Sequence, residues 1–482
     1  MTAPITPWYS HVRGSSDGVS EAQANSVASS VPPNPSRRRT TLPMNTQRNG
    51  SSPISGHPGK GTKVSDVEQA SLELTVGPVA HGGWCVARHE GRVVFVRHAL
   101  PGERVIADVT EETSRFLRAD AVEILEASPD RVVPPCPYAG PGRCGGCDWQ
   151  HATLEAQRRL KAQVVAEQLR RLAGIEREVV VEEVPGAKDG LGWRTRVQFA
   201  ATPTGELGFR RHRSHDIEVV DACLIAHPEV EAAGAEDHLW PGAAGVEVIA
   251  SSGGDRAVVV APRARRSVTV PDLEAPASVL LDQGKGRTVP RRGSGVLHEQ
   301  VGDREFRVAG SGFWQVHPGA AETLLDAVLA YAAPEPGEWA LDLYCGVGLF
   351  AAGLAEVVGP EGAVFGLESE AAAVRDARAN LRDLPQARVE RGRVEEALDR
   401  FQIERADLVV VDPPRSGLGR DVVDRIVSLD ALRVVYVSCD PATLARDLAW
   451  FRDGGYALSD LRAFDAFPMT HHVECVALLV KE

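Results

Sequence analysis

The 482-residue sequence lacks long apolar runs and has no excess of positive charge. No stretch approaches the roughly 20 apolar residues that are needed to span a bilayer. The N-terminus also lacks the basic residues followed by an apolar segment that are typical of a secretory signal. We therefore expect a protein of the cytoplasm that does not associate with membranes.

Cysteine is scarce as well, with 8 residues in the whole chain. So few exclude a disulfide scaffold, and in a reducing compartment clustered cysteines more often bind a metal or take part in catalysis. The formal net charge of −13 excludes a protein coated with positive charge, so any nucleic-acid site must be a local basic surface. The hydrophobic content of 43% is ordinary for a globular protein of about two or three domains.

Changes in composition predict three regions before the C-terminal part. Residues 1–66 are rich in small and polar residues and include the basic run Arg37–Arg39, so they predict a disordered tail. Residues 67–128 contain short β-rich stretches between turn residues, which predict a small closed barrel of the oligonucleotide-binding type. Residues 129–311 predict a mixed α+β central domain with a helix near 154–172. The expected barrel strands are Leu72–Val76, Val93–Val96, Val105–Val109 and Ala121–Leu125.

In residues 312–482, helices and apolar strands alternate. This pattern predicts an α/β domain with an open, mainly parallel sheet of the Rossmann-like kind. The expected strands are Ala340–Leu343, Ala363–Leu367, Leu408–Val411 and Val434–Val437.

A glycine-containing turn follows the first of these strands. Gly346 and Gly348 stand between an apolar strand and a helix, where glycine lets the backbone approach a ligand. Glu368 ends the next strand, 26 residues after Asp342, and can accept hydrogen bonds from both ribose hydroxyls of an adenosine cofactor. Asp342 would face a pyrophosphate unfavourably but suits a cationic sulfonium, and the third glycine of the dinucleotide pattern is absent. The turn therefore favours S-adenosylmethionine over NAD.

Two further motifs follow the third and fourth strands: Asp412-Pro413-Pro414-Arg415 and Ser438-Cys439-Asp440-Pro441. Ligands of open α/β sheets gather at the carboxyl ends of strands, so both motifs fall on the cofactor's side. A thiolate that adds to carbon 6 of uracil gives carbon 5 the carbanion character that methylation needs, and Cys439 suits this role. Glu474 suits the base that must then remove the hydrogen from carbon 5. Without such context, a cysteine after a buried strand is usually a small core residue.

Together these motifs resemble the RNA uracil-5-methyltransferases that act on transfer and ribosomal RNA. The resemblance runs from about residue 70 to the C-terminus, and the order of its last two motifs is highly specific. The matching segments are Gly91–Val96 and Leu100–Glu103 of a TRAM-like barrel, the cysteine cluster, Phe313–Val316, the glycine turn, Asp412–Arg415, Ser438–Pro441 and His472–Glu474.

The resemblance implies S-adenosylmethionine-dependent formation of 5-methyluridine in tRNA or rRNA. It makes Cys439 the nucleophile and Glu474 the base. It places the cofactor contacts at Gln315, Tyr344, Glu368 and Asp412. His317 and Leu349 stand where some members have asparagine, which bears on cofactor affinity rather than on the type of reaction.

Two other functions stay open on the sequence alone. Methylation of RNA cytosine at carbon 5 would use the same thiolate addition. An RNA-binding iron–sulfur protein with an inactive methyltransferase domain is the alternative from a different class. The presence of Asp412, Cys439 and Glu474 weighs against that alternative.

Four cysteines form a second candidate site: Cys136, Cys144 and Cys147 lie close together, and Cys223 follows far downstream. Four thiolates suit either an iron–sulfur cluster or tetrahedral zinc. Zinc sites more often use two closely spaced pairs, whereas three clustered cysteines with one remote ligand resemble the 4Fe-4S arrangement of the family, although the first gap of seven residues is longer than in the family. We expect a 4Fe-4S cluster that organises loops, because methyl transfer from a sulfonium requires no redox step.

Basic residues with interleaved aromatics between 191 and 215 predict an RNA-binding face on the central domain. They are Arg194, Arg196, Arg210, Arg211 and Arg213, with Trp193 and Phe209. A second basic set, either part of that face or an ordinary solvated surface, comprises Arg263, Arg265, Arg266, Arg287, Arg291 and Arg292. The target base must leave its stack to meet the nucleophile, so a looped uridine is the expected substrate. The sequence predicts no protein partner.

Overall fold

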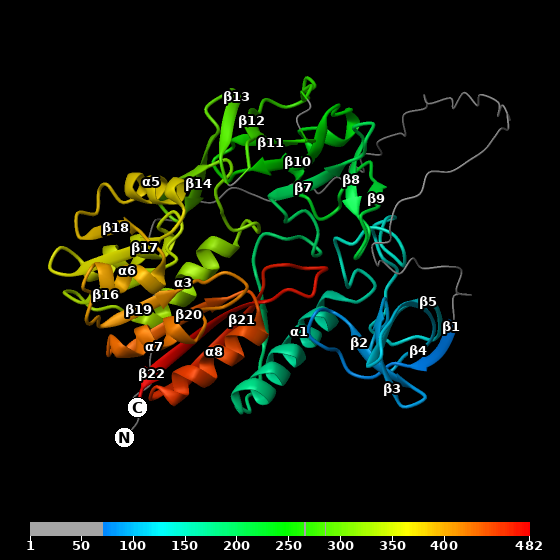
Figure 1. Cartoon of the computed structure of the whole chain (residues 1–482), viewed down its shortest axis with the longest axis horizontal. Helices are drawn as coiled ribbons and strands as arrows, with labels where there is room; N and C mark the ends of the chain where they lie inside the picture. The colour runs from blue at the N-terminus through cyan, green and yellow to red at the C-terminus, as the bar shows by residue number, and fades with distance from the viewer. Residues whose placement is uncertain (1–70, 265–266, 285) are drawn as a thin grey trace, which may run out of the picture. The chain divides into compact units, whose positions relative to one another are not determined.

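The computed structural model describes residues 71–264, 267–284 and 286–482 (Figure 1). The predicted tail at 1–66, with Arg37–Arg39, lies outside these residues, as do Arg265 and Arg266. The strands of the described part form three larger sheets and one hairpin. No helix in that part has the length and apolar content that crossing a membrane requires.

The first sheet has five strands in the order β1-β4-β5-β3-β2. They are β1 (Ser71–Thr75), β2 (Cys85–His89), β3 (Arg92–Arg97), β4 (Arg104–Glu112) and β5 (Phe116–Glu126). After β1, Gly77 N donates to Val86 O (2.8 Å) and Val86 N to Pro78 O (2.9 Å), so the chain pairs with β2 and the sheet curls round on itself. Glycine is required at 77 because a Cβ there would lie 2.7 Å from the Val86 oxygen. The four predicted strands are confirmed, and the sheet is compatible with the predicted barrel.

Helix α1 (Leu154–Gln168) connects the barrel with the C-terminal part of the chain. It begins at Thr153, whose hydroxyl accepts a hydrogen bond from Ala156 N (3.2 Å) as a helix cap. Leu160 and Val164 add one side of the helix to the barrel core. Another side packs against α8 (Pro441–Asp453). The predicted helix is therefore confirmed, and it contacts both neighbours at once.

The second sheet belongs to the central region and has seven strands in the order β13-β12-β11-β10-β7-β8-β9. They are β7 (Arg196–Ala201), β8 (Leu207–Arg210), β9 (Ile217–Val219), β10 (Ala243–Ala250), β11 (Arg256–Pro262), β12 (Ser278–Asp282) and β13 (Thr288–Arg292). Only β11 and β12 run parallel, and the other neighbouring strands run antiparallel. The short helix α2 (Pro228–Glu231) and the hairpin of β14 (Val296–Val301) and β15 (Arg304–Ala309) complete this region.

The third sheet has eight strands in the order β18-β17-β16-β19-β20-β22-β21-β6. They are β16 (Trp339–Leu343), β17 (Ala363–Glu368), β18 (Ala387–Arg391), β19 (Leu408–Val411), β20 (Arg433–Ser438), β21 (Tyr456–Asp465), β22 (Glu474–Lys481) and β6 (Val181–Glu183). The first five in this order run parallel, whereas β22 runs antiparallel to both β20 and β21. The predicted Rossmann-like sheet and its four predicted strands are confirmed.

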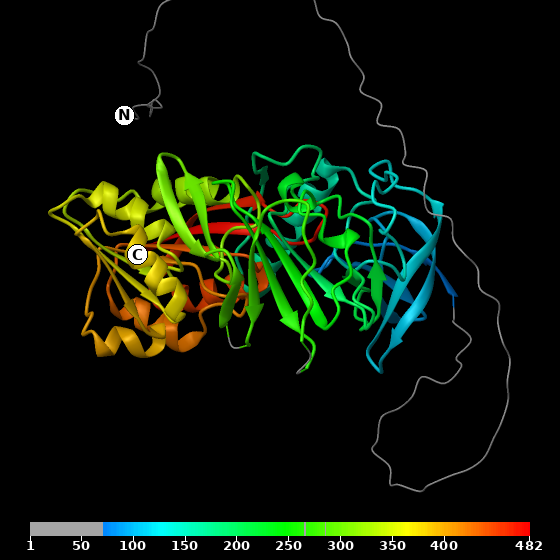
Figure 2. The same ribbon diagram turned by 90° about the horizontal axis from the view of Figure 1, so that it is seen from above.

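Helices cover both faces of this third sheet. One face packs against α3 (Ala320–Ala332), α4 (Leu349–Val358) and α5 (Ala371–Asn380). The other packs against α6 (Val394–Arg400), α7 (Arg420–Ser428) and α8. Figure 2 shows the yellow helices on one side of the strands and the orange helices on the other. Burial on both faces explains why β19 is a continuous apolar run, Leu-Val-Val-Val, rather than an alternating one.

The last strand of the third sheet comes from far earlier in the chain. β6 pairs in parallel with the end of β21, so that Val181 lies opposite Ala463 and Glu183 opposite Asp465. This strand belongs to the predicted central region at 129–311, and it completes a sheet whose other strands lie in 312–482. The predicted domain boundaries themselves stay a prediction.

Candidate active site

The glycine turn predicted to bind the cofactor lies between β16 and α4. Tyr344, Gly346 and Gly348 all have positive φ, at 66°, 53° and 90°, a region that costs glycine little but is uncommon for tyrosine. Gly346 N donates a hydrogen bond to Glu368 Oε2 (3.1 Å) at the end of β17. The turn and the neighbouring strand end are thus joined directly, as the predicted adenosine site requires.

Asp342 lies buried beneath this turn at the end of β16. Its Oδ2 accepts a hydrogen bond from Ala351 N (2.8 Å), but its buried Oδ1 has no hydrogen-bond partner among the described residues. The pKa of Asp342 is raised to about 8, mainly by burial and also by the nearby Asp412 and Glu368, against the opposing hydrogen bond from Ala351 N. An unsatisfied buried oxygen in an acidic setting suits a positively charged ligand, which the sulfonium donor supplies.

Among the other predicted cofactor residues, Tyr344 belongs to the turn itself, and Glu368 and Asp412 lie at the ends of the two strands that flank β16. The carboxylate of Glu368 is held by Glu370 N (2.7 Å) as well as by Gly346 N. Tyr344 is half-buried, and burial raises the pKa of its hydroxyl. Gln315 is half-buried in the segment between β15 and α3, next to Val316, whose carbonyl oxygen accepts from Thr195 N (2.8 Å). Asp412 directly follows β19, the strand beside β16.

The predicted nucleophile and base lie side by side in the third sheet, where β20 ends and β22 begins. Cys439 directly follows β20, and Glu474 begins β22. Because β22 runs antiparallel to β20, with Ser438 opposite Cys475, the start of one strand lies beside the end of the other. The sheet topology therefore brings together two side chains that are 35 residues apart in the sequence.

The charges in this cluster act strongly on one another. The pKa of Cys439 is raised to about 12, mainly by burial and also by Glu474, whereas Arg415 opposes the rise. Burial also raises the pKa of Glu474 well above its ordinary value, with the same opposing effect of Arg415. Burial alone raises the pKa of Asp412 to about 7. Without substrate, the cluster therefore favours a neutral thiol and a protonated Glu474 at neutral pH.

The turn that carries Cys439 is fixed from two directions. Asp440 caps α8, because its Oδ1 accepts from Ala442 N (3.0 Å) and Thr443 N (2.9 Å). Its other oxygen, Oδ2, lies 3.1 Å from Nε2 of His81, in the loop between β1 and β2. Burial opposes ionisation of this carboxyl, but the hydrogen bond from His81 lowers the pKa of Asp440 to about 2. The barrel thus contacts the residue next to the predicted nucleophile, for which the sequence carries no local signal.

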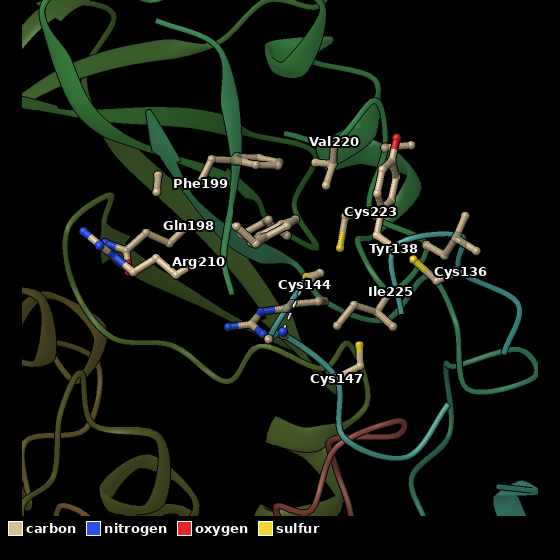
Figure 3. Close-up of a pocket in the computed structure, with 18 of the residues that line it drawn as sticks. Cys136, Tyr138, Cys144, Cys147, Gln198, Phe199, Arg210, Val220, Cys223 and Ile225 are labelled. Atoms are coloured by element: carbon tan, nitrogen blue, oxygen red, sulfur yellow. Dashed lines mark hydrogen bonds between the residues drawn. The ribbon is translucent and has the colours of Figure 1, made fainter. Parts of the chain in front are cut away.

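The four clustered cysteines line a single cavity of about 470 Å³. It lies between the second sheet and the segment 136–149, which we call the cysteine loop. In Figure 3, Cys136, Cys144, Cys147 and Cys223 surround one space, and the sulfur atoms of Cys136, Cys147 and Cys223 are turned towards it. Burial raises the pKa of Cys147, and the neighbouring Cys223 and Cys144 raise it further, so these thiols lie close enough to affect one another. Among the described residues, no three His, Cys, Asp or Glu side chains are grouped so as to hold a single metal ion.

Two members of the predicted RNA-binding face lie in the interior of the protein. Trp193 is fully buried and stacks on His317 with ring centroids 6.0 Å apart. Arg196 is buried as well, and its guanidinium donates to the carbonyl oxygens of Gly310 (2.8 Å) and Gly312. These two residues support the fold from inside, so their prediction as RNA contacts was wrong. The exposed members are Arg210, Arg211, Arg213, Arg287, Arg291 and Arg292.

Comparisons with known proteins agree with this architecture. The family model described as tRNA (uracil-5-)-methyltransferase matches residues 297–482, and the TRAM domain model matches residues 70–122. Two proteins named as uncharacterized RNA methyltransferases, from Streptomyces avermitilis and Streptomyces coelicolor, are 54% and 55% identical over 421 residues. These alignments cover 84% of this chain and 97% and 92% of the two relatives.

A solved structure shows the same overall arrangement. It is the Pyrococcus abyssi tRNA (uracil-54, C5)-methyltransferase in complex with S-adenosyl-L-homocysteine, with 25% identity and a TM-score of 0.65. The superposition covers 84% of this chain and 99% of that one. On the family matches, the relatives and this fold, the chain belongs to the S-adenosylmethionine-dependent RNA uracil-5-methyltransferases.

Proposed function

We propose that this enzyme methylates carbon 5 of a looped uridine in tRNA or rRNA through a covalent bond between Cys439 and the base. The observation that carries the proposal is that Cys439 and Glu474 lie side by side where β20 ends and β22 begins. The glycine turn follows β16 of the same sheet, at the same ends of the parallel strands. Asp412 raises the pKa of both Glu474 and Asp342. One group of interacting acids therefore extends from the predicted donor site to the predicted base.

The proposed reaction has three steps. The thiolate of Cys439 adds to carbon 6 of the uracil ring, which makes carbon 5 nucleophilic. Bound S-adenosylmethionine supplies the methyl group that carbon 5 takes. Glu474 then removes the proton from carbon 5, the electron pair restores the double bond between carbons 5 and 6, and Cys439 leaves as a thiolate.

Arg415 is suited to prepare both catalytic groups. It lowers the pKa of Cys439 and of Glu474, whereas burial raises both. Its side chain is exposed, so it can also contact a phosphate of the incoming RNA. We propose that Arg415 favours the thiolate and carboxylate forms that the reaction requires.

For the donor, we propose that Glu368 holds the ribose and that Asp342, Asp412, Gln315 and Tyr344 complete the pocket. The unpartnered oxygen of Asp342 supports this assignment, because a buried acceptor requires a partner. The carboxylate of Glu368 is already oriented by two backbone N–H groups, and it keeps acceptor capacity for hydroxyl groups.

We further propose that Cys136, Cys144, Cys147 and Cys223 hold a 4Fe-4S cluster rather than zinc. The four thiols line one cavity of about 470 Å³, yet they are not grouped tightly enough for a single ion. Bonds of about 2.3 Å to one zinc ion would draw four sulfurs to within roughly 4 Å of one another, whereas a cluster of four irons keeps its cysteines further apart. Iron and sulfide analysis of anaerobically purified protein tests this assignment; bound zinc without iron would reject it.

The decisive test of the function is mass spectrometry of the enzyme after incubation with S-adenosylmethionine and RNA that contains 5-fluorouridine. Fluorine at carbon 5 cannot be removed as a proton, so the covalent intermediate stays trapped. We expect an RNA adduct on the peptide that contains Cys439, and the attached fragment identifies the target RNA. A folded, donor-binding enzyme that forms no adduct with cellular tRNA or rRNA would reject the proposal.

A further inference from the structure

We propose that Asp148, from the cysteine loop, is a positioning residue for the base Glu474. The inference rests on the proposed function, because it concerns the step that Glu474 performs. Asp148 directly follows Cys147, and the segment it holds is the turn Met469–His471. That turn ends three residues before Glu474.

The cysteine loop binds this turn through both backbone and side chain. The carbonyl oxygen of Met469 accepts hydrogen bonds from Asp148 N (2.9 Å) and Trp149 N (3.0 Å). The side chain of Asp148 accepts from His471 N (3.2 Å) and lies 2.6 Å from His471 Nδ1, both through Oδ2. Only 14% of the Asp148 side chain is exposed, so solvent weakens these bonds little.

The turn needs such support because its own conformation is unfavourable. Met469 has a positive φ of 67°, which costs a non-glycine residue energy unless its surroundings hold it. The turn lies between β21 and β22 and forms no helix or strand of its own. A further anchor is α1, where Gln157 Oε1 accepts from Met469 N (2.8 Å).

A second contact from α1 reaches the chain just before the turn. Lys161 is completely buried, forms an ion pair with Asp465 and donates to Phe467 O (3.0 Å). The segment from 465 to 471 is therefore held on one side by α1 and on the other by the cysteine loop. Asp148 is the residue whose side chain links the cysteine loop to the part of this segment nearest to Glu474.

Loss of this link affects one chemical step and leaves another intact. Addition of the Cys439 thiolate to carbon 6 takes no proton from carbon 5, so it does not use the Glu474 carboxylate as that base. Release requires the Glu474 carboxylate to reach the proton on carbon 5, after which the double bond re-forms and Cys439 departs. A shift of about 1 Å at such a group can slow its step by roughly 100-fold.

The test compares Asp148→Asn and Asp148→Ala with the wild-type enzyme on RNA that contains ordinary uridine. We expect the methylated covalent complex to accumulate on denaturing gels, with release slowed on the order of 10- to 100-fold for alanine and less for asparagine. The rate of adduct formation with 5-fluorouridine RNA should change far less than the rate of release. Asp130→Asn is the matched control, because it removes a surface carboxylate that pairs with Arg159 of α1 (2.7 Å).

Three results would overturn the inference. Release at the wild-type rate in both Asp148 variants would show that the link does not position the base. An equal fall in adduct formation and release in the Asp148 variants would indicate a general loss of structure. His471→Ala removes the other partner of the same bond, and if it also fails to accumulate the methylated complex, the inference is overturned. A wild-type enzyme that forms no adduct would reject the proposed function and this inference with it.

Discussion

The two ends of the catalytic site are built in different ways. Most of the proposed donor end comes from one continuous stretch, β16 to the end of β17, whose hydrogen bonds join residues fewer than 30 positions apart, and Gln315 and Asp412 are proposed to add to it from outside this stretch. At the transfer end, Asp440 is bound by His81 from 359 positions away, and His471 by Asp148 from 323 positions away. The proposed donor site thus consists mainly of a local motif, whereas the proposed transfer site is assembled from several regions of the chain.

Replacement of the nucleophile should separate the two ends most sharply. We expect Cys439→Ala to reduce methylation by at least about 10⁴-fold, as for other enzymes that lose a covalent nucleophile. Donor affinity, measured by calorimetry with S-adenosylmethionine, should be unchanged. Cys475→Ala, at a buried neighbouring position, is the control, and it should retain adduct formation. Substantial methylation by folded Cys439→Ala would contradict the assignment.

Replacement of Glu368 at the proposed donor end should weaken donor binding and leave adduct formation nearly unchanged. Glu368→Ala removes hydrogen bonds from a charged acceptor, typically about 1.5–3 kcal/mol each, so the KM for S-adenosylmethionine should rise about 10- to 100-fold. At saturating donor, adduct formation on 5-fluorouridine RNA should be close to normal. Glu370→Ala tests the specificity of the effect, because this neighbouring residue caps α5 instead. An unchanged KM would remove Glu368 from the donor site.

Protonation of the buried donor-site acid should appear in the stability of the free enzyme. The pKa of Asp342 is raised from 3.8 to about 8, so between these pH values the folded protein holds a proton that the unfolded chain releases. The free energy of unfolding should therefore fall as the pH rises, by up to about 1.4 kcal/mol per pH unit from this group. Asp342→Asn should flatten the decline in melting temperature between pH 5 and 8. Asp424→Asn, an exposed surface carboxylate, should leave the slope as it is, and an equal slope in both variants would refute the prediction.

The contact of the barrel with the nucleophile turn should have the smallest effect. His81 is 39% exposed, so its pairing with Asp440 contributes no more than about 1 kcal/mol, and α8 keeps its cap without it. We expect His81→Ala to slow adduct formation by up to about fivefold, with partial rescue by His81→Gln. His89→Ala at the end of β2 is the control. If His81→Ala weakened donor binding more than it slowed adduct formation, the prediction that His81 supports the turn of Cys439 would be contradicted.

The same division explains what the sequence could predict. The glycine turn, Asp342 and Glu368 are close in sequence and lie at apolar strands, so their local pattern was sufficient to predict the fold around them, and their role in donor binding stays a proposal. The partnership of Cys439 and Glu474 depends on an antiparallel strand, and the sequence supplied it through the resemblance to a family rather than through periodicity. His81 and Asp148 gave no signal, because their partners lie more than 300 positions away.

Trp193 and Arg196 show the complementary error. Alternating aromatic and basic residues are typical of an RNA-binding surface, but the same pattern fits a strand end whose side chains point inwards. Arg196 is stabilised there by carbonyl oxygens of the segment around Gly310, which cannot be recognised before the chain folds. A charged residue is buried only when such partners exist, and its partners are invisible in the local sequence.

The pairing of β6 with β21 bears on how the protein can be divided. A fragment that starts at the predicted methyltransferase boundary would lose Val181–Glu183 and leave the backbone donors and acceptors near Asp465 bare. Uncovered strand edges invite another chain to add itself to the sheet. Three residues from an earlier part of the chain thus cover the backbone of β21, and we expect a fragment without them to aggregate more readily than the full chain.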